Sequence, residues 1–379
     1  MPKILISTGE VSGDLQGALL IHALRRLRPD LEILGIGGER MAQAGAKLLA
    51  NTTHMGSIGL LEHLPFVFPT LRLLQKMRRE LALHPPDVVV LIDYVGFNLP
   101  LARSCKRWGC PLIYYIAPQE WVWPTTNTQA IVALVDQVLA VFPQEAEYYQ
   151  KAGVPLVDWV GHPLVDDLAG AESRQEARQK LGIAPEQKMV ALLPASRRQE
   201  FKYLWPVLAQ TAQQLQQQHP DLEFWLPLAL PQYQEQLEKD ICHYNLRARV
   251  VNEPARRVIA AADLALAKSG TVNLETALLD VPQVVIYRVS PVTAWLARHL
   301  LRFKIAFMSP VNLVVMREII PELLQEQAEP QKLTQLALEY LQNPAPMRQR
   351  YQEFRQALGV PGATERAAQA ILAHCAEIG

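Results

Sequence analysis

Two short polar turns in the second half of the chain contain residue types that bind phosphate groups. The first is Ser269-Gly270-Thr271, which follows the apolar run 264–267 and precedes a predicted helix over 274–279. Such a turn leaves several backbone N–H groups unpaired and pointing outward, at the positive end of the helix dipole. Lys268 is a candidate to face the phosphates, although a solvent-facing lysine is commoner, and Glu275 can accept hydrogen bonds from a ribose.

The second turn, Pro194-Ala195-Ser196-Arg197, follows the apolar run 189–193. A guanidinium such as that of Arg197 can pair with a phosphate through two parallel hydrogen bonds. The alternative is an ordinary surface arginine. Two turns of this kind in one sheet indicate a nucleotide held at the carboxyl ends of parallel strands.

The first predicted strand, 3–7, ends in a loop that carries acids. Only two glycines are present in this loop, so the G-x-G-x-x-G spacing of a dinucleotide-binding turn is absent. Glu10, Ser12 and Asp14 lie in the loop, and their acids would repel a pyrophosphate. The loop therefore favours a sugar ligand or a proton acceptor, with helix capping by Ser12 and Asp14 as the alternative.

Asp93 follows the buried strand predicted over 87–92. Partial burial at the end of a strand would raise the pKa of this carboxyl group and suit it to act as a general base. Capping of the next helix is the alternative for Asp93. Further along, Trp121 and Trp123 could stack on sugar rings or line an acyl groove, or pack in the core.

These residues must be positioned by elements that alternate between apolar runs and helical patterns. Strand followed by helix, repeated, predicts α/β architecture with parallel sheets and right-handed crossovers. We expect two Rossmann-like lobes with a hinge near Gly161-His162-Pro163: residues 1–163, completed by helices of 345–379, and residues 164–344. The predicted strands are 3–7, 31–36, 87–92, 111–116, 137–141, 189–193, 224–228, 248–251, 264–267 and 283–287.

Composition excludes several classes of protein. The chain has 379 residues, with 37 basic and 37 acidic side chains, so no net charge draws it to nucleic acid. Its 4 cysteines show no metal spacing and are expected to be reduced thiols of a cytoplasmic protein without a secretory signal. The sequence has no apolar run of about 20 residues, so no membrane-spanning helix is predicted.

Two amphipathic segments predict contact with the surface of an anionic membrane. Residues 60–77 and 295–303 combine apolar side chains with flanking cations. Ordinary packing helices have a similar pattern, so this interpretation rests on having both segments in one chain.

Taken together, the motifs resemble those of the lipid-A-disaccharide synthases, nearly from end to end of the chain. The resemblance rests on Gly9-Glu10-x-Ser12-Gly13-Asp14, Gly37-Gly38-x-Arg40-Met41, Met55-Gly56, Ile92-Asp93-x-x-x-Phe97-Asn98, Pro118-x-x-Trp121-x-Trp123, Gly161-His162-Pro163, Leu192-Leu193-Pro194-x-Ser196-Arg197-x-x-Glu200, Ser269-Gly270-Thr271-x-x-x-Glu275, and Asn312 before Arg317-Glu318.

This resemblance implies a glycosyltransferase type B fold and an inverting transfer without a metal or other cofactor. The donor would be UDP-2,3-diacylglucosamine and the acceptor 2,3-diacylglucosamine 1-phosphate (lipid X). The protein would be cytoplasmic and peripherally associated with the inner membrane. A homodimer is a further expectation for partners. By position, Asp93 matches the family's candidate base, and Glu10, Arg197 and Asn312 match other functionally important residues.

His162 and Glu10 are the alternatives to Asp93 as base. Two departures from the family pattern concern Ala195, where a glycine is usual, and Ser309-Pro310-Val311-Asn312, which has an additional residue before Asn312. Three rival interpretations remain at this point: a UDP-sugar 2-epimerase or other UDP-sugar transferase of the same fold, a dinucleotide-dependent oxidoreductase, and a non-catalytic lipid-binding scaffold.

Overall fold

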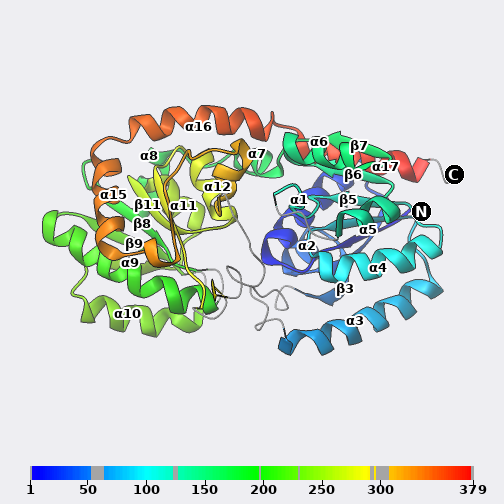
Figure 1. Ribbon diagram of the computed structural model, residues 1–379, viewed down its shortest axis with the longest axis horizontal. Coiled ribbons are helices and arrows are strands. Elements are labelled where there is room, and N and C mark those ends of the chain that lie inside the picture. Colours follow the sequence, from blue (N-terminus) through cyan, green and yellow to red (C-terminus); the bar gives the residue numbers. More distant parts are fainter. Residues whose placement is uncertain are drawn as a thin grey trace. The chain divides into compact units, whose positions relative to one another are not determined.

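The computed structural model describes residues 2–52, 64–122, 127–195, 198–228, 231–290, 294–295 and 307–376. They form two compact units, the first comprising Met1–Ala169 and Ala357–Gly379, and the second Gly170–Gln356. In each unit, helices alternate with the strands of one parallel sheet (Figure 1). The predicted fold class, α/β with two Rossmann-like lobes, is confirmed.

The sheet of the first unit has the strand order β3-β2-β1-β4-β5-β6-β7, with every neighbouring pair parallel. Its strands are β1 (Lys3–Ser7), β2 (Glu32–Gly37), β3 (Lys47–Asn51), β4 (Val88–Ile92), β5 (Leu112–Tyr115), β6 (Gln137–Ala140) and β7 (Leu156–Trp159). Its helices are α1 (Val11–Leu27), α2 (Glu39–Gln43), α3 (Leu64–Leu83), α4 (Val95–Arg107), α5 (Asn127–Leu134), α6 (Pro143–Ala152), α7 (Pro163–Leu168) and α17 (Ala363–Ala376).

The sheet of the second unit has the order β10-β9-β8-β11-β12-β13 and is also parallel throughout. Its strands are β8 (Met189–Leu193), β9 (Glu223–Pro227), β10 (Ala248–Val251), β11 (Leu264–Lys268), β12 (Gln283–Tyr287) and β13 (Glu322–Leu324). The remaining elements are α8 (Arg174–Leu181), α9 (Arg198–Gln218), η1 (Pro231–Tyr233), α10 (Gln234–His243), α11 (Ala255–Ala261), α12 (Thr271–Leu278), α14 (Pro310–Val315), η2 (Gln325–Gln327), α15 (Pro330–Gln342) and α16 (Ala345–Leu358).

The central strands of the second sheet are buried on both faces, which explains their continuous apolar sequence. Successive side chains point to opposite faces. Val190 and Leu192 therefore join the core beneath α9 and α15, whereas Ala191 and Leu193 join the core beneath α8 and α11.

The C-terminal segment divides between the two units later than we expected. Most of α16 belongs to the second unit, because Tyr351 donates a hydrogen bond to Val281 O at 2.9 Å and Arg355 contacts Asp280 at 2.8 Å. Only α17 completes the first unit, where it contacts α1. The other boundary falls after Ala169 instead of at residue 163.

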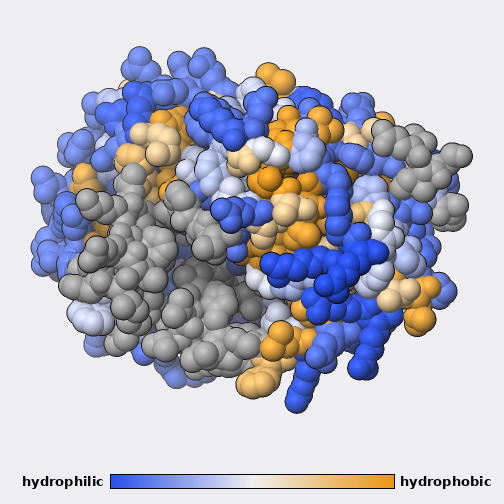
Figure 2. Space-filling view, turned by 45° about the vertical axis from the view of Figure 1, so that its right-hand side comes forward, coloured by the Kyte–Doolittle hydropathy of each residue, from blue (hydrophilic) through white to orange (hydrophobic). Residues whose placement is uncertain are grey.

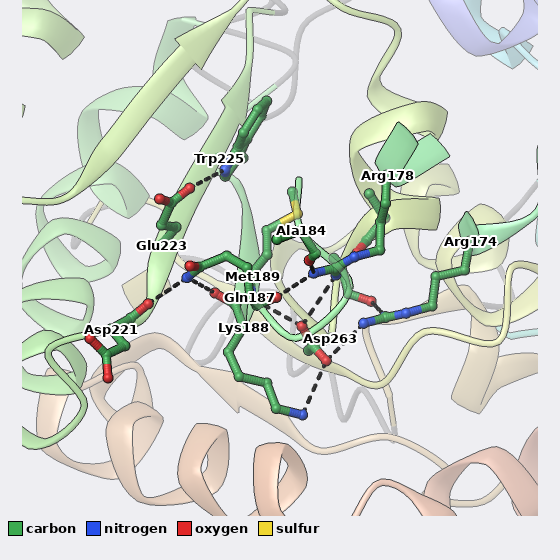
Figure 3. Close-up of polar contacts among 12 residues, drawn as sticks. Arg174, Arg178, Ala184, Gln187, Lys188, Met189, Asp221, Glu223, Trp225 and Asp263 are labelled. Atoms are coloured by element: carbon green, nitrogen blue, oxygen red, sulfur yellow. Dashed lines mark hydrogen bonds and ion pairs between the residues drawn. The ribbon is translucent and has the colours of Figure 1, made fainter. Parts of the chain in front are cut away.

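A charged network joins the amino-terminal ends of β8 and β11 (Figure 3). Asp263 accepts a hydrogen bond from Met189 N at 2.9 Å and lies 2.9 Å from Arg174 and 3.4 Å from Lys188. Arg178 is buried and donates to Ala261 O, so α8 is held against this edge of the sheet. Because these hydrogen bonds and ion pairs join α8 to the two strands, we assign the network a structural role. Ligand sites in parallel sheets lie at the opposite edge, at the carboxyl ends of the strands.

Candidate active site

The strand order of each sheet reverses at one point, and crevices at such points bind ligands in open α/β sheets. In the first unit the reversal lies between β1 and β4, and in the second between β8 and β11. The carboxyl ends of β1 and β4 lead into the Glu10 loop and Asp93, and that of β11 leads into Ser269-Gly270-Thr271. The predicted residues therefore lie at both reversal points.

The backbone of Asp93 is held by hydrogen bonds from both of its polar groups. Its N–H donates to Ile116 O at 3.1 Å, and its C=O accepts hydrogen bonds from Tyr114 Oη at 2.7 Å and Asn98 Nδ2 at 2.8 Å. The φ angles of Asp93 and Tyr94 are 44° and 48°, an uncommon backbone for residues other than glycine. The expected partial burial of Asp93 is wrong, because the side chain is exposed at this turn.

Asn98 holds this turn against the end of β1 and had no predicted role. Its amide accepts a hydrogen bond from Ser7 Oγ at 2.7 Å and donates to the carbonyls of Ile92 and Asp93 at 3.2 and 2.8 Å. The side chain is fully buried. The spacing Asp93-x-x-x-Phe97-Asn98 was the only sequence signal for it.

The Glu10 loop is tightly packed beside the Asp93 turn. Glu10 is half-buried and directly precedes α1, and its side chain accepts no helix-capping hydrogen bond. A Cβ atom at Gly9 would collide with the ring of Tyr94, so glycine is required for this close approach. Burial raises the pKa of Tyr94, and the nearby Glu10 carboxylate adds to this effect. Glu10 and the Asp93 turn are thus neighbours.

Ser12 and Asp14 do not cap α1, because this helix already begins at Val11. Asp14 is buried, and its carboxylate accepts hydrogen bonds from the backbone N–H groups of Gly38, Arg40 and Met41 at 2.8, 3.1 and 3.1 Å. It therefore stabilises the start of α2. The expectation that Asp14 binds substrate is corrected, because both of its oxygens are occupied by the backbone. Ser12 is half-buried and stays a candidate.

His162 is poorly suited to act as a base. It is 5% exposed, its Nδ1 accepts a hydrogen bond from Leu164 N at 3.2 Å, and burial lowers its pKa to about 3. Its ring packs on Phe142, with ring centroids 5.3 Å apart.

Trp121 also packs on Phe142, with ring centroids 6.1 Å apart. The indole N–H of Trp121 is buried without a hydrogen-bond partner in the described structure. An orphan donor of this kind keeps Trp121 a candidate to contact substrate.

In the second unit, the turn after β11 is arranged differently from the prediction. Ser269 N donates to Ile286 O at 3.2 Å, and Gly270 N donates to Asn273 Oδ1 at 2.8 Å. These two amides are therefore not available to an anion, contrary to expectation. Thr271 and Val272 begin α12, and the first N–H groups of a helix have no acceptor within it. They are the remaining amide donors at this turn.

Lys268 lies over the turn and does not face open solvent. Its side chain is 13% exposed, and its Nζ is 3.3 Å from Glu200 Oε1. The same Nζ would be 2.9 Å from a Cβ atom at residue 270, so Gly270, with φ of 151°, leaves room for the ammonium group. Glu275 is half-buried on α12, one helical turn beyond Thr271.

Asn312, on α14, is connected to this turn through a series of hydrogen bonds. The side chain is fully buried and donates to Ile320 O and Glu322 Oε1 at 2.8 and 2.6 Å. Its carbonyl oxygen accepts hydrogen bonds from Ile319 N and Ile320 N at 2.7 and 3.0 Å. The expectation that Asn312 binds substrate is corrected, because its amide group is fully used inside the protein.

Glu322 continues the connection and was missed in the sequence. It accepts a hydrogen bond from Met308 N at 2.7 Å, and Met308 O accepts one from Ser269 Oγ at 2.7 Å. Burial raises the pKa of Glu322. Asn312 thus reaches the Ser269 turn through Glu322 and Met308.

Ser196, Arg197 and Trp123 lie outside the described residues, as does most of segment 295–303. Among the residues that are described, no group of three metal-ligating side chains occurs, and no helix is long and apolar enough to cross a membrane.

The two sheets define the class of protein as α/β with a glycosyltransferase type B fold. Solved structures share it: the S. aureus MnaA-UDP co-structure aligns with a TM-score of 0.67 at 16% identity, covering 97% of this chain and 95% of that chain. A putative UDP-N-acetylglucosamine 2-epimerase from Listeria monocytogenes aligns with a TM-score of 0.70 at 15% identity, covering 99% and 97%. At such identities these similarities establish the fold alone.

The family follows from sequence comparison. A family model described as lipid-A-disaccharide synthetase matches residues 4–373. The lipid-A-disaccharide synthases of Gloeothece citriformis and a Synechocystis species are 50% and 51% identical to the chain, covering 98% of it and 99% and 97% of their own lengths. The chain belongs to the lipid-A-disaccharide synthase family, and it is an enzyme of the hexosyltransferase class.

Proposed function

We propose that the protein joins UDP-2,3-diacylglucosamine to 2,3-diacylglucosamine 1-phosphate (lipid X), giving a β-1,6-linked disaccharide phosphate and UDP with inversion at the anomeric carbon. The observation that carries the proposal is the position of Asp93 and Lys268 at the strand-order reversals of their sheets, in a chain of this family. Each unit has its own part in the reaction.

The first unit would activate the acceptor. The attacking hydroxyl must lose its proton, and the exposed Asp93 carboxylate is our first choice as base. Glu10 is the alternative base in the same region. Ser12, Trp121 and Trp123 would contact the acylated sugar.

The second unit would hold UDP and stabilise the charge that develops on it as it leaves. Lys268, the Thr271 and Val272 amides and the guanidinium of Arg197 are the proposed donors, and Glu275 would accept from the ribose. Ser196 and the segment Ser269-Gly270 would shape the site. Charge stabilisation by fixed donors of this kind requires no metal or other cofactor.

The protein would work at the inner face of the inner membrane. On α3, Phe68 and Leu71 are 74% and 50% exposed, and Arg72 and Lys76 are exposed beside them. Figure 2 shows hydrophobic and hydrophilic side chains next to one another at the bottom of the view, where α3 runs in Figure 1. Such a mixture suits an anionic lipid surface. A homodimer, the other expected partner, stays a prediction.

The test is incubation of the protein with both substrates, followed by mass analysis of the lipid product and detection of free UDP. We expect a disaccharide phosphate that appears in step with UDP. Formation of UDP without a disaccharide, or of an epimerised UDP-sugar, would contradict the proposal.

A further inference from the structure

A small apolar recess opens at the carboxyl ends of β8 and β9, wholly within the second unit. Its walls include Pro194 and Ala195 after β8, Leu226 and Leu228 at the end of β9, Phe201 on α9 and Tyr233 on η1. We propose that this recess binds part of a fatty acyl chain of the donor sugar. The inference rests on the proposed function and adds to it the place where acyl length is sensed.

The chemistry of the walls favours hydrocarbon. Within the described part of the chain, the lining contains no charged side chain, and the hydroxyl of Tyr233 is its one polar side-chain group. A uracil ring or a sugar would need several hydrogen-bond partners there, because burying unpaired polar groups is costly. An acyl chain needs none.

The walls are ordered and partly open. The rings of Phe201 and Tyr233 are stacked with centroids 4.1 Å apart, and Phe201 also stacks on Trp205 at 6.1 Å. Phe201 and Leu226 are 7% and 1% exposed, so they form the floor. Ala195, Leu228 and Tyr233 are half-buried and form the rim.

The recess lies where an acyl chain of the donor sugar can reach it. β8 pairs with β9 on one side and with β11 on the other, and β11 leads into Lys268 and the proposed diphosphate turn. Neighbouring strands are about 5 Å apart, so the recess lies one or two strand spacings from that turn. In the donor, the acylated carbons are the near neighbours of the anomeric carbon that carries the diphosphate. A chain attached there can enter the recess while the diphosphate stays at the turn.

The first test changes the size of the recess. Leu228→Trp should fill it, and Leu338→Trp, at a half-buried leucine on α15 outside the recess, is the matched control. Each methylene removed from an apolar site costs about fourfold in binding. We therefore expect the kcat/KM of Leu228→Trp to fall roughly tenfold or more with a long-chain donor, and to change less than about twofold with a short-chain donor.

Failure of the recess proposal and failure of the proposed function give different results. UDP affinity, measured by calorimetry, should be unchanged in Leu228→Trp, since the turn after β11 is untouched. An equal loss of kcat/KM with both donors, or no loss with either, would show that the recess does not bind the acyl chain. Transfer by the unsubstituted protein would still support the proposed function. No transfer of any acylated sugar by the unsubstituted protein overturns the proposed function and the assigned ligand with it.

A second measurement does not depend on the folding of a variant. A donor with a photoreactive group at the end of one acyl chain is irradiated with the unsubstituted protein, and the labelled peptides are identified. We expect label at Leu228 or Tyr233, competed by excess unlabelled donor. Label confined to other peptides contradicts the proposal.

Discussion

At the residue scale, the proposed function depends on the carboxylate of Asp93, which is exposed at the end of β4. Asn98, Tyr114 and Ile116 hold the backbone of Asp93 in place through hydrogen bonds. A residue held in an unusual backbone conformation by its neighbours is a reasonable place to expect function.

Asp93→Asn should therefore reduce turnover without disturbing the fold. We expect kcat to fall by about 10²- to 10⁴-fold, because general base catalysis is lost, and UDP affinity to stay unchanged. Asp87→Asn is the control, since Asp87 lies at the amino end of the same strand and bonds Lys3 N. Turnover close to that of the unsubstituted protein would remove Asp93 as base.

His162 should affect the pH dependence of stability, not the base step. Its pKa is lowered by burial to about 3, while an unfolded histidine titrates near 6.5. Between these values the unfolded chain binds more protons, so the free energy of unfolding falls with falling pH, by up to about 1.4 kcal/mol per pH unit. His162→Asn keeps a capping acceptor and should flatten this slope between pH 6.5 and 4.

Denaturant unfolding at several pH values measures the effect. Glu145, whose pKa burial raises to about 8, is present in both proteins and cancels in the comparison. Identical slopes for the two proteins would show that His162 is not buried in its neutral form.

At the element scale, α14 and β13 hold in place the proposed diphosphate turn that follows β11. Asn312→Ala removes four hydrogen bonds and leaves buried backbone groups of Ile319 and Ile320 unpaired. We expect a loss of roughly 2–4 kcal/mol in stability together with weaker UDP binding. The control is Asn343→Ala, at an exposed asparagine after α15. Reduced turnover with unchanged stability would instead mean that Asn312 contacts substrate.

The return of α17 to the first unit depends on Asp166. Its carboxylate accepts hydrogen bonds from Gly362 N, Thr364 N and Thr364 Oγ1 at 2.5, 2.8 and 2.7 Å, at the start of α17. Asp166→Ala should cost about 1–2 kcal/mol and speed amide exchange in α17 selectively. Glu365→Ala, at an exposed position in the same helical turn, should change exchange little. Uniform exchange in both variants would disprove this capping role.

Elements buried on both faces were predictable from the sequence. The predicted bounds of β1, β8 and β12 agree with the structure, because these strands are mostly buried apolar runs. The predicted bounds of β10 also agree, although β10 is a partly exposed edge strand. The strands β3 and β7 were missed, since both lie at sheet edges and are partly exposed. The strand β13 was also missed, since it has only 3 residues and includes the charged Glu322.

The candidate site was predictable in position and less so in detail. Glu10, Asp93 and Lys268 follow apolar runs, so their location at strand ends could be anticipated. The hydrogen bonds that Asp14 and Asn312 make within the protein could not be anticipated, because their partners come from other segments of the chain. Whether a polar side chain faces a ligand or the protein depends on tertiary geometry that no local pattern encodes.

At the scale of the whole molecule, the question is how a protein with no spanning helix among its described residues meets acylated substrates. We expect Phe68→Ser combined with Leu71→Ser to reduce binding to anionic vesicles at least about tenfold, since both side chains are exposed on α3. Leu156→Ser, at another exposed leucine of the first unit, is the control. Vesicle sedimentation measures binding, and equal binding by all three proteins would rule out α3 as the contact.

The most direct measurement of the central claim is a crystal structure of the protein with UDP. We predict the diphosphate at the turn that follows β11, within hydrogen-bond reach of Lys268 and the Thr271 amide, with the ribose beside Glu275. UDP bound elsewhere, with this turn unoccupied, would contradict the account.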